Sequence, residues 1–338
     1  MNTRSLLRLS IAALGFAAAR LAVLADPSEI PDAPGSNPIF RDVFTADPAP
    51  LVVGDTVYVY VGRDNAKDKE MFTMPAWLCY SSKDMKTWTA HGEVLRPTDF
   101  TWGEPNSAWA SQVVQKDGKF YFYATLRGDQ SARGNNIGVA VAESPLGPFK
   151  DAIGRPLIRN DMTPEAKRPW EDIDPTVFID DGGTAWMSWG NGDCYLVKLK
   201  SNMVEIDGPI EKIDLPHYVE GPWIYKRGAL YYLVYAAIVP PLGSEQIAYA
   251  TAPQIKGPWT YQSLITGPAK NSFTIHPGVV DFNGQSYFFY HFAGLTLNGE
   301  AGALGRRAIC VEYLHYNPDG TIRPITQTVE GVSVPPKN

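Results

Sequence analysis

The sequence predicts an all-β fold, a five-bladed β-propeller formed by a single domain. Three observations predict it: composition, a repeated hairpin and the spacing of the residues that lead each hairpin. The 338 residues include 17 Tyr, 9 Trp, 30 Gly and 28 Pro, and aromatic residues favour strands whereas Gly and Pro mark turns. Hydrophobic residues make up 44% of the chain, which is typical of a globular protein with a sizeable core.

The repeated unit is a short apolar strand, a turn containing Gly, Asp or Asn, and a second strand rich in aromatic residues and valine. Such turn residues adopt positive φ readily, as tight β connections require. The hairpins are expected at residues 46–61, 108–125, 173–189, 219–236 and 275–291. A third strand is expected after most of them, at residues 77–81, 137–142, 247–252 and 309–313.

The residues that lead the five hairpins are Asp47, Trp109, Asp174, Glu220 and His276. Their separations of roughly 45 to 65 residues suit one four-stranded blade per interval. In a propeller the first strands line the central channel, so these leading residues would converge. A β-sandwich built from hairpins is the alternative, but it gives no reason for the start of every first strand to be distinctive.

Residues 1–25 have the layout of a secretory signal peptide. Arg4 and Arg8 precede an apolar run, and Val23-Leu24-Ala25 offers small residues for cleavage. The run is short for a bilayer span and is interrupted by Arg20, so cleavage after Ala25 is favoured over a retained membrane anchor. We therefore expect export to the periplasm or the medium, with no membrane attachment after cleavage. Residues 26–36 would be a linker, 37–325 the propeller and 326–338 a tail.

Charge and cysteine content exclude several classes of protein. The chain has 30 Lys and Arg against 36 Asp and Glu, and loss of the three arginines of residues 1–25 would leave a net charge of −9. Nucleic-acid binding needs clustered cations, so a neutral sugar is a better partner. Cys79, Cys194 and Cys310 are far apart and odd in number, which predicts buried free thiols rather than disulfides or a metal site.

Three of the leading residues are acids with similar surroundings. Asp47 lies in Ala-Asp-Pro-Ala-Pro, Asp174 in Ile-Asp-Pro-Thr-Val, and Glu220 in Val-Glu-Gly-Pro-Trp. One acid next to proline is usually a turn residue. Three at equivalent interior positions need another reason, because burying an unpaired carboxylate is costly.

From about Asn37 to Ile325 the chain resembles glycoside hydrolase family 43, in particular its β-xylosidase and α-L-arabinofuranosidase members. The resemblance implies a five-bladed propeller and an inverting O-glycosyl hydrolase. It assigns the general base to Asp47, the general acid to Glu220, and a residue that modulates and orients the acid to Asp174. An ionised Asp174 near Glu220 would raise the pKa of the acid by like-charge repulsion.

The resemblance and the residue types together give further candidate site residues. The resemblance implies that His276 lies beside a calcium ion on the propeller axis and that Arg307 contacts sugar hydroxyls; no organic cofactor is expected. Trp109 and Trp77 could stack on a sugar ring, although either could be core. Asn191 is a candidate polar contact to substrate.

The expected function is removal of xylose or arabinofuranose from oligosaccharides derived from xylan or arabinan. The alternatives are an endo-arabinanase and a non-catalytic carbohydrate-binding propeller, which would not need all three acids. Retaining invertase-like enzymes share the architecture, but their acid is commonly followed by Cys, whereas Gly221 follows Glu220 here. The loops at residues 64–76 and 129–136 would decide between exo and endo action. The sequence leaves the preferred sugar and the oligomeric state open.

Overall fold

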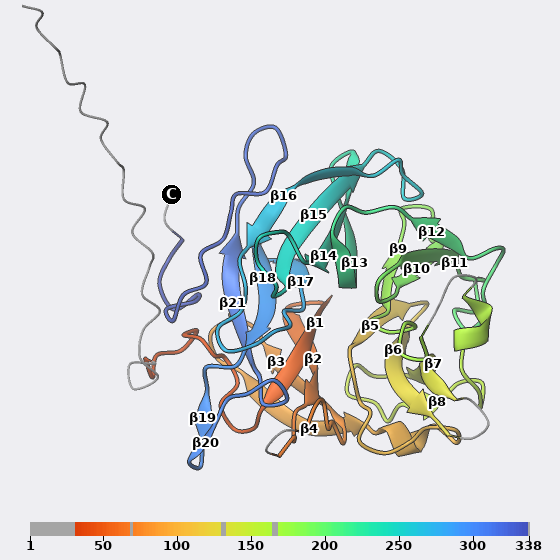
Figure 1. Ribbon diagram of the computed structural model, residues 1–338, viewed down its shortest axis with the longest axis horizontal. Coiled ribbons are helices and arrows are strands. Elements are labelled where there is room, and N and C mark those ends of the chain that lie inside the picture. Colours follow the sequence, from red (N-terminus) through yellow and green to blue (C-terminus); the bar gives the residue numbers. More distant parts are fainter. Residues whose placement is uncertain (1–30, 68–69, 130–132, 164–167, 337–338) are drawn as a thin grey trace, which may run out of the picture.

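Five antiparallel sheets surround a central axis in the computed structural model of the protein (Figure 1). The structure describes residues 31–67, 70–129, 133–163 and 168–336. The ring of sheets confirms the predicted five-bladed β-propeller. The predicted signal peptide of residues 1–25, and residues 26–30 of the predicted linker, lie outside the described residues. No helix in the described part of the chain is long and apolar enough to cross a membrane.

Each of the first four blades has four strands in sequence order. Blade one contains β1 (Thr45–Val53), β2 (Thr56–Arg63), β3 (Trp77–Ser82) and β4 (Thr89–Leu95). Blade two contains β5 (Ser111–Lys116), β6 (Lys119–Gly128), β7 (Gly134–Ala142) and β8 (Lys150–Asp151). Blade three contains β9 (Thr176–Ile179), β10 (Ala185–Trp189), β11 (Cys194–Lys198) and β12 (Glu211–Ile213). Blade four contains β13 (Tyr218–Arg227), β14 (Leu230–Ala237), β15 (Gln246–Ala252) and β16 (Thr260–Thr266).

The fifth blade differs from the four-stranded pattern that the spacing predicts. Its sheet has three strands in the described residues: β17 (Gly278–Phe282), β18 (Gln285–Phe292) and β21 (Ala308–Leu314). A separate hairpin, β19 (Thr296–Leu297) with β20 (Glu300–Ala301), is inserted between β18 and β21. Two short 3₁₀ helices, η2 (Pro97–Asp99) and η3 (Asn160–Met162), lie in the connections that follow β4 and β8.

The segment before β1 covers the open side of β21. The N–H of Ile39 donates to the carbonyl of Ile309, and the side-chain amide of Asn37 pairs with the backbone of Val311 in both directions. The chain therefore closes its ring by laying its N-terminal segment against its last strand, which satisfies backbone groups at an edge that would otherwise be open.

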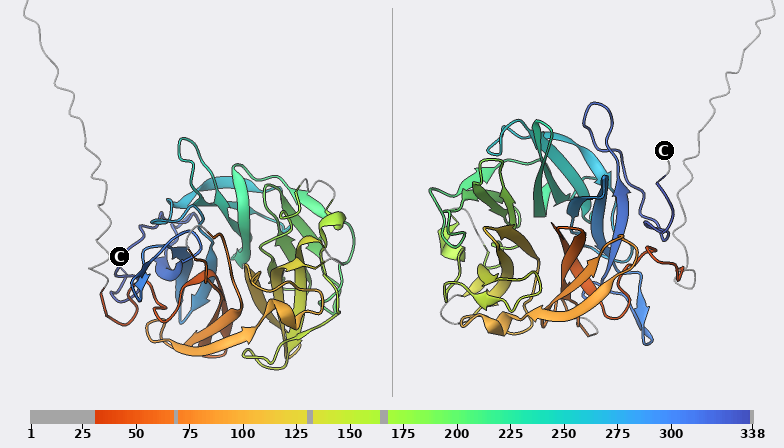
Figure 2. Two further views of the ribbon diagram at one scale, coloured as in Figure 1. Left: turned by 60° about the horizontal axis from the view of Figure 1, so that its bottom comes forward. Right: turned by 180° about the vertical axis from the view of Figure 1, so that it is seen from behind.

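The first strands of the blades form the inner wall of the ring. β1 contacts β5 and β17, and β13 contacts β9 and β17, while β5 contacts β9. Figures 1 and 2 show these strands nearest the axis, with the later strands of each blade farther out. Residues that lead the first strands therefore come together although they are far apart in sequence.

The hairpin turns contain the residue types that the sequence analysis relied on. In the β5–β6 turn both Asp117 (φ 50°) and Gly118 (φ 79°) have positive φ, and Asn283 (φ 48°) and Gly284 (φ 76°) repeat this in the β17–β18 turn. Two successive positive φ values define the turn whose twist matches that of the flanking strands. These turns fix the register in which each first strand pairs with the second.

Aromatic side chains fill the space between neighbouring blades. Trp77 and Tyr60 of blade one contact Phe122 of blade two edge-on, with ring centroids 5.5 and 5.6 Å apart. All three side chains are fully buried. Burying one large apolar side chain contributes roughly 1.5–3 kcal/mol, so this interface holds the first two blades in a defined orientation. Cys79, Cys194 and Cys310 are buried free thiols, as predicted.

Candidate active site

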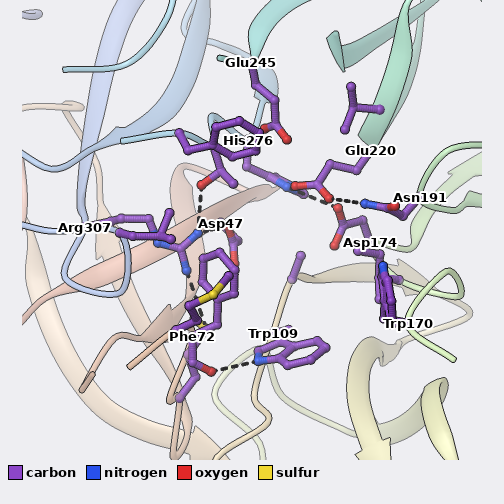
Figure 3. Close-up of a pocket in the computed structure, with 18 of the residues that line it drawn as sticks. Asp47, Phe72, Trp109, Trp170, Asp174, Asn191, Glu220, Glu245, His276 and Arg307 are labelled. Atoms are coloured by element: carbon purple, nitrogen blue, oxygen red, sulfur yellow. Dashed lines mark hydrogen bonds and ion pairs between the residues drawn. The ribbon is translucent and has the colours of Figure 1, made fainter. Parts of the chain in front are cut away.

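A pocket of about 450 Å³ opens among the inner ends of the blades (Figure 3). Its polar lining consists of Asp47, Asn135, Asp174, Asn191, Glu220, Glu245, Thr274, His276 and Arg307. Its apolar lining consists of Met71, Phe72, Met74, Trp109, Ala110, Trp170, Ile173, Val219, Phe273 and Leu304. The five residues that lead the hairpins are all in these two sets, so the structure brings together the residues that the spacing analysis selected.

Asp47 projects into the pocket from an irregular place in β1. The pairing of β1 with β2 shifts between Ala46 and Ala49, and Asp47 itself has a φ of 58°. A non-glycine residue with positive φ is uncommon, and such residues collect where a side chain must be aimed at a functional site. The bulge and the strained backbone turn the carboxylate of Asp47 out of the strand and toward the axis.

Asp174 and Glu220 are held by the backbone that surrounds them. Asp174, with a φ of 62°, donates its N–H to Oγ1 of Thr125 at 2.8 Å. Its Oδ2 accepts the N–H of Gly221 at 3.0 Å. Gly221 has a φ of 62°, and a Cβ there would meet Nδ1 of His276 at 3.1 Å. Glycine after Glu220 therefore lets the backbone bring the two carboxyl groups to the same end of the pocket.

Asp47 is an ionised carboxylate. Burial alone would raise its pKa, but the Arg307 guanidinium, 3.3 Å from Oδ1, and the neighbouring His291 outweigh burial and hold the pKa of Asp47 below its usual value. Asp47 is therefore in its ionised form near neutral pH.

Glu220 shows the opposite shift. Burial raises the pKa of Glu220 to about 7, and the charge of Asp47 adds to the effect. The side-chain amide of Asn191 donates to Oε2 of Glu220 at 2.6 Å and opposes the rise. The expectation was that Asp174 would raise this pKa, but burial is the main cause. Two carboxyl groups of one pocket thus differ in protonation near neutral pH.

Asp174 and His276 line the same pocket as these two groups (Figure 3). Burial raises the pKa of Asp174 well above its usual value, and the charges of Glu220 and Asp47 add to the rise. Burial lowers the pKa of His276 to about 4, so its imidazole is neutral near pH 7. Nδ1 of His276 lies 3.8 Å from Oδ2 of Asp174. The charge of Glu220 therefore disfavours ionisation of Asp174, so the two carboxyl groups titrate as a coupled pair.

Arg307 lies in the pocket, but most of its donors are engaged within the protein. Nε donates to Oδ2 of Asp64 at 2.8 Å and Nη2 to Oδ1 of Asp64 at 3.0 Å, a bidentate pair. Nη1 reaches Asp47 at 3.3 Å. The guanidinium donors that were predicted to contact sugar hydroxyls are thus bonded to two carboxylates. The neighbouring Arg306 does not line this pocket, and its Nε donates to the carbonyl of Ala301.

The two tryptophans proposed as substrate contacts have different environments. Trp109 lines the pocket, and its Nε1 donates to the carbonyl of Phe72 at 3.0 Å. Trp77 is fully buried and donates its Nε1 to the carbonyl of Trp109 at 2.7 Å. The prediction that Trp77 contacts substrate is corrected, because packing against Phe122 leaves its ring no face for a sugar. Trp77 instead supports the backbone that presents Trp109.

The surroundings of His276 do not form a metal site made of protein ligands. Among the residues that the structure describes, no group of three or more His, Cys, Asp or Glu side chains could hold a metal ion. Calcium requires six to eight oxygen ligands. A calcium ion beside His276 would therefore depend on water for nearly all of its ligands.

Sequence reasoning missed two acids in and beneath the pocket. Asp64, which follows β2 and has a completely buried side chain, orients Arg307. Glu245, which precedes β15, accepts the N–H of Ile275 at 3.1 Å and donates its own N–H to Phe273. Burial and the charge of Glu220 raise the pKa of Glu245. Neither acid leads a first strand, and neither lies beside proline, so the repeat pattern contains no signal for them.

Comparison with known proteins identifies relatives across most of the chain. A family model described as Glycosyl hydrolases family 43 matches residues 36–322. A β-D-galactofuranosidase of Aspergillus niger is 28% identical, over 88% of this chain and 86% of its own length. A xylosidase/arabinosidase of Bacteroides ovatus is 27% identical, over 85% of this chain and 95% of its own.

Solved structures share the architecture. A β-xylosidase/α-arabinofuranosidase from a compost microbial metagenome, crystallised with xylotriose in a calcium-free form, superposes with a TM-score of 0.74. It is 27% identical, and the match covers 88% of this chain and 98% of that one. An α-L-arabinofuranosidase from Clostridium thermocellum is 30% identical with a TM-score of 0.71, over 86% of this chain and 97% of the other.

Proposed function

The chain belongs to glycosyl hydrolases family 43, and on that premise we propose that it removes terminal xylose or arabinofuranose from oligosaccharides by inversion. Membership makes it an O-glycosyl hydrolase and confirms the resemblance seen in the sequence. Relatives named as xylosidases and arabinosidases support the choice of a pentose. Neighbouring structures crystallised with xylotriose support an oligosaccharide substrate.

One observation supports the catalytic assignment above all others. Asp47 and Glu220 line the same pocket, and their pKa values are shifted in opposite directions. Titratable groups whose environments separate their pKa values in this way are the acid and base of a hydrolase. We assign the general base to Asp47 and the general acid to Glu220.

In this mechanism Asp47 removes a proton from the attacking water as the water forms its bond to the anomeric carbon. Glu220 donates its proton to the glycosidic oxygen as that bond breaks, and attack from the opposite face inverts the anomeric configuration. Arg307 keeps Asp47 ionised. Burial keeps Glu220 protonated up to about pH 7, and Asn191 fixes the orientation of its Oε2. Asp174 accepts the N–H of Gly221 and so positions the backbone next to Glu220.

The sugar would be held between the carboxyl groups and the aromatic wall of the pocket. Trp109 presents an indole ring to the same cavity as the acids, and sugar rings stack on aromatic faces through their apolar C–H surfaces. A pocket of about 450 Å³ lies within the range of small-ligand sites. Phe72 and Asn135, from the two loops singled out in the sequence, border this pocket and would limit the length of sugar chain it admits.

The decisive experiment measures hydrolysis of nitrophenyl β-D-xylopyranoside and nitrophenyl α-L-arabinofuranoside by the protein without residues 1–25. A β-D-galactofuranoside belongs in the set because one relative is named for that activity. Glu220→Gln, shown by circular dichroism to be folded, is the control. NMR of the first anomer released tests inversion. Wild-type turnover in Asp47→Ala, Asp174→Ala and Glu220→Gln alike would contradict the assignment.

Action on oligosaccharides rather than polymers is tested separately. Release of single pentoses from xylotriose or arabinotriose supports exo action. Shortening of linear arabinan from within would support the endo-arabinanase alternative instead. Sugar binding without hydrolysis of any of these substrates would support the alternative of a non-catalytic carbohydrate-binding propeller.

A calcium ion beside His276, retained mainly by water, is a further proposal. It would supply positive charge near Asp174 and help keep the axis of the propeller ordered. Calorimetric titration of chelator-treated protein with Ca²⁺ tests it, and equal melting temperatures with and without Ca²⁺ would count against it.

Export is the remaining proposal and rests on the sequence of residues 1–25 alone. Cleavage after Ala25 would release a protein that begins at Asp26. Intact-mass measurement of the protein recovered from the periplasm or medium tests this. Retention of the full chain in membranes would contradict it.

A further inference from the structure

Three exposed apolar side chains gather at the rim of the pocket. In the described part of the chain, six large hydrophobic residues are substantially exposed, and Met71, Trp170 and Phe273 are 63%, 46% and 49% exposed. These three line the pocket, and they come from three separate loops. A contiguous apolar patch around a cavity marks a binding surface, whereas single exposed apolar residues carry no such meaning.

Trp170 lies on the side of the pocket that holds Glu220. The residue after it, Glu171, accepts the backbone N–H of Asn191 at 2.9 Å, and the side chain of Asn191 donates to Glu220 at 2.6 Å. Figure 3 shows Trp170 below Asp174 and Asn191, on the opposite side of the view from Phe72 and Arg307. The indole is therefore connected through two hydrogen bonds to the carboxyl group assigned as the acid.

The loop that presents Trp170 is braced. The guanidinium carbon of Arg168 lies 5.2 Å from the centre of the indole ring, and Nε of Arg168 pairs with Glu171 at 2.7 Å. The carbonyl of Pro169 accepts the N–H of Asn135 at 2.6 Å. A platform held in this way loses little conformational entropy when a ring stacks on it, which is the property that makes an aromatic side chain an effective anchor.

The position of the acid determines which part of the substrate contacts Trp170. The acid donates its proton to the glycosidic oxygen, so the leaving group lies on the side of Glu220, and the retained sugar lies toward Asp47. We propose that Trp170 binds the first sugar of the leaving group by stacking, while Phe273 and Met71 supply the other exposed apolar side chains that line the pocket. The inference rests on the proposed function and makes the substrate an oligosaccharide whose leaving group is itself a sugar ring.

Stacking on Trp170 would act on ground state and transition state alike, because the leaving-group ring does not change shape during cleavage. Such uniform binding lowers KM and leaves kcat little affected. A purely structural role for Trp170, in contrast, would disturb Asn191 and Glu220. It would lower kcat on every substrate and shift the alkaline limb of the pH profile.

The test compares two substrates with the same retained pentose. One is the trisaccharide, xylotriose or arabinotriose, and the other is the methyl glycoside, whose leaving group is too small to reach the rim. The variants are Trp170→Ala, Trp170→Phe and, as a matched control, Leu146→Ala, which truncates an exposed side chain of a β7–β8 turn outside the pocket.

We expect Trp170→Ala to lower the ratio of kcat/KM for trisaccharide over methyl glycoside by about 10-fold, mainly through KM, since aromatic stacking contributes up to about that factor. Trp170→Phe should restore most of the ratio, and Leu146→Ala should match the wild type. A wild-type ratio in Trp170→Ala would overturn the inference. So would an equal loss of kcat on both substrates with a shifted pH profile.

A binding measurement distinguishes failure of this inference from failure of the proposed function. Calorimetric titration of the trisaccharide into Glu220→Gln protein is compared with Glu220→Gln/Trp170→Ala. Suppose that the wild type hydrolyses none of the substrates, and that Glu220→Gln/Trp170→Ala binds the trisaccharide about 10-fold more weakly than Glu220→Gln. Stacking on Trp170 is then supported, and the catalytic proposal fails. If the trisaccharide binds neither variant, the platform is overturned as well.

Discussion

The guanidinium of Arg307 lies 3.3 Å from Asp47 and holds Asp64 through two hydrogen bonds of 2.8 and 3.0 Å. One buried cation is thus shared by two buried carboxylates from blade one, and Arg307 itself comes from the junction before β21 in blade five. The charge state of Asp47 therefore depends on correct closure of the ring.

Replacing Arg307 with Lys should impair the base. Lysine cannot make the bidentate pair with Asp64, so the charge beside Asp47 is displaced and the pKa of Asp47 rises, with His291 left to oppose the effect of burial. Because Asp47 must be ionised, the acidic limb of the kcat/KM profile should move to higher pH. We expect kcat/KM at neutral pH to fall by about 10-fold for each unit by which the pKa of Asp47 comes to exceed the assay pH.

The Arg307→Lys measurement is a pH–rate profile beside a melting curve, with Arg306→Lys as control. Arg306 is half-buried and is not among the residues that line the pocket. An acidic limb identical to that of the wild type would show that Arg307 does not set the charge of Asp47.

The alkaline limb should report Glu220. Its pKa of about 7 predicts that kcat/KM falls as pH rises through neutrality, because the deprotonated carboxylate has no proton to donate. Glu220→Gln should remove this limb and lower kcat by about 10²–10⁴-fold on an oligosaccharide. The loss should be smaller on a nitrophenyl glycoside, whose leaving group needs little protonation. Equal losses on both substrates would argue against Glu220 as the acid.

Asn191 offers a finer test of the same limb. Its hydrogen bond lowers the pKa of Glu220, so Asn191→Ala should raise that pKa and move the alkaline limb to higher pH. At the same time kcat should fall by about 10-fold, because Glu220 loses the donor that orients it. A profile measured between pH 5 and 9 checks both effects. A limb displaced toward lower pH would contradict the assignment.

Glu312 should make stability depend on pH at the closure of the ring. It accepts hydrogen bonds from Asn37 at 3.0 Å and from the backbone of Thr328 at 2.7 Å, and burial raises its pKa to about 7. The folded state therefore holds the proton more tightly than the unfolded state, whose pKa is about 4.3. The stabilisation is complete below pH 4.3 and is lost as pH rises through 7.

Glu312→Gln keeps a neutral acceptor and cannot ionise, so it should flatten the decline in melting temperature between about pH 4.3 and 7. Differential scanning calorimetry of both proteins over that range gives the difference curve, which removes the shared contribution of the pocket carboxyl groups. Parallel curves for the two proteins would show that Glu312 is not responsible.

The repeated hairpin could be found in the sequence because its signals are local. Asn283-Gly284 is a typical turn sequence, and the strands on either side of it are apolar and aromatic. The same unit occurs five times in the chain. Asp47, Asp174 and Glu220 could be found for the same reason, since each occupies the same place in its unit. Trp77 was misassigned because its position in a strand indicates a face of the sheet but not the neighbouring blade that covers this face.

The sequence by itself therefore determined the architecture, the closing of strands into hairpins and the identity of three acids that lead first strands. Only the tertiary structure decided their chemistry. The pKa of Asp47 is low because Arg307, 260 positions away, lies against it, and that of Glu220 is high because the packed blades remove water from around it. Charge and desolvation depend on distances through space, and these exist only once blade five has closed against blade one.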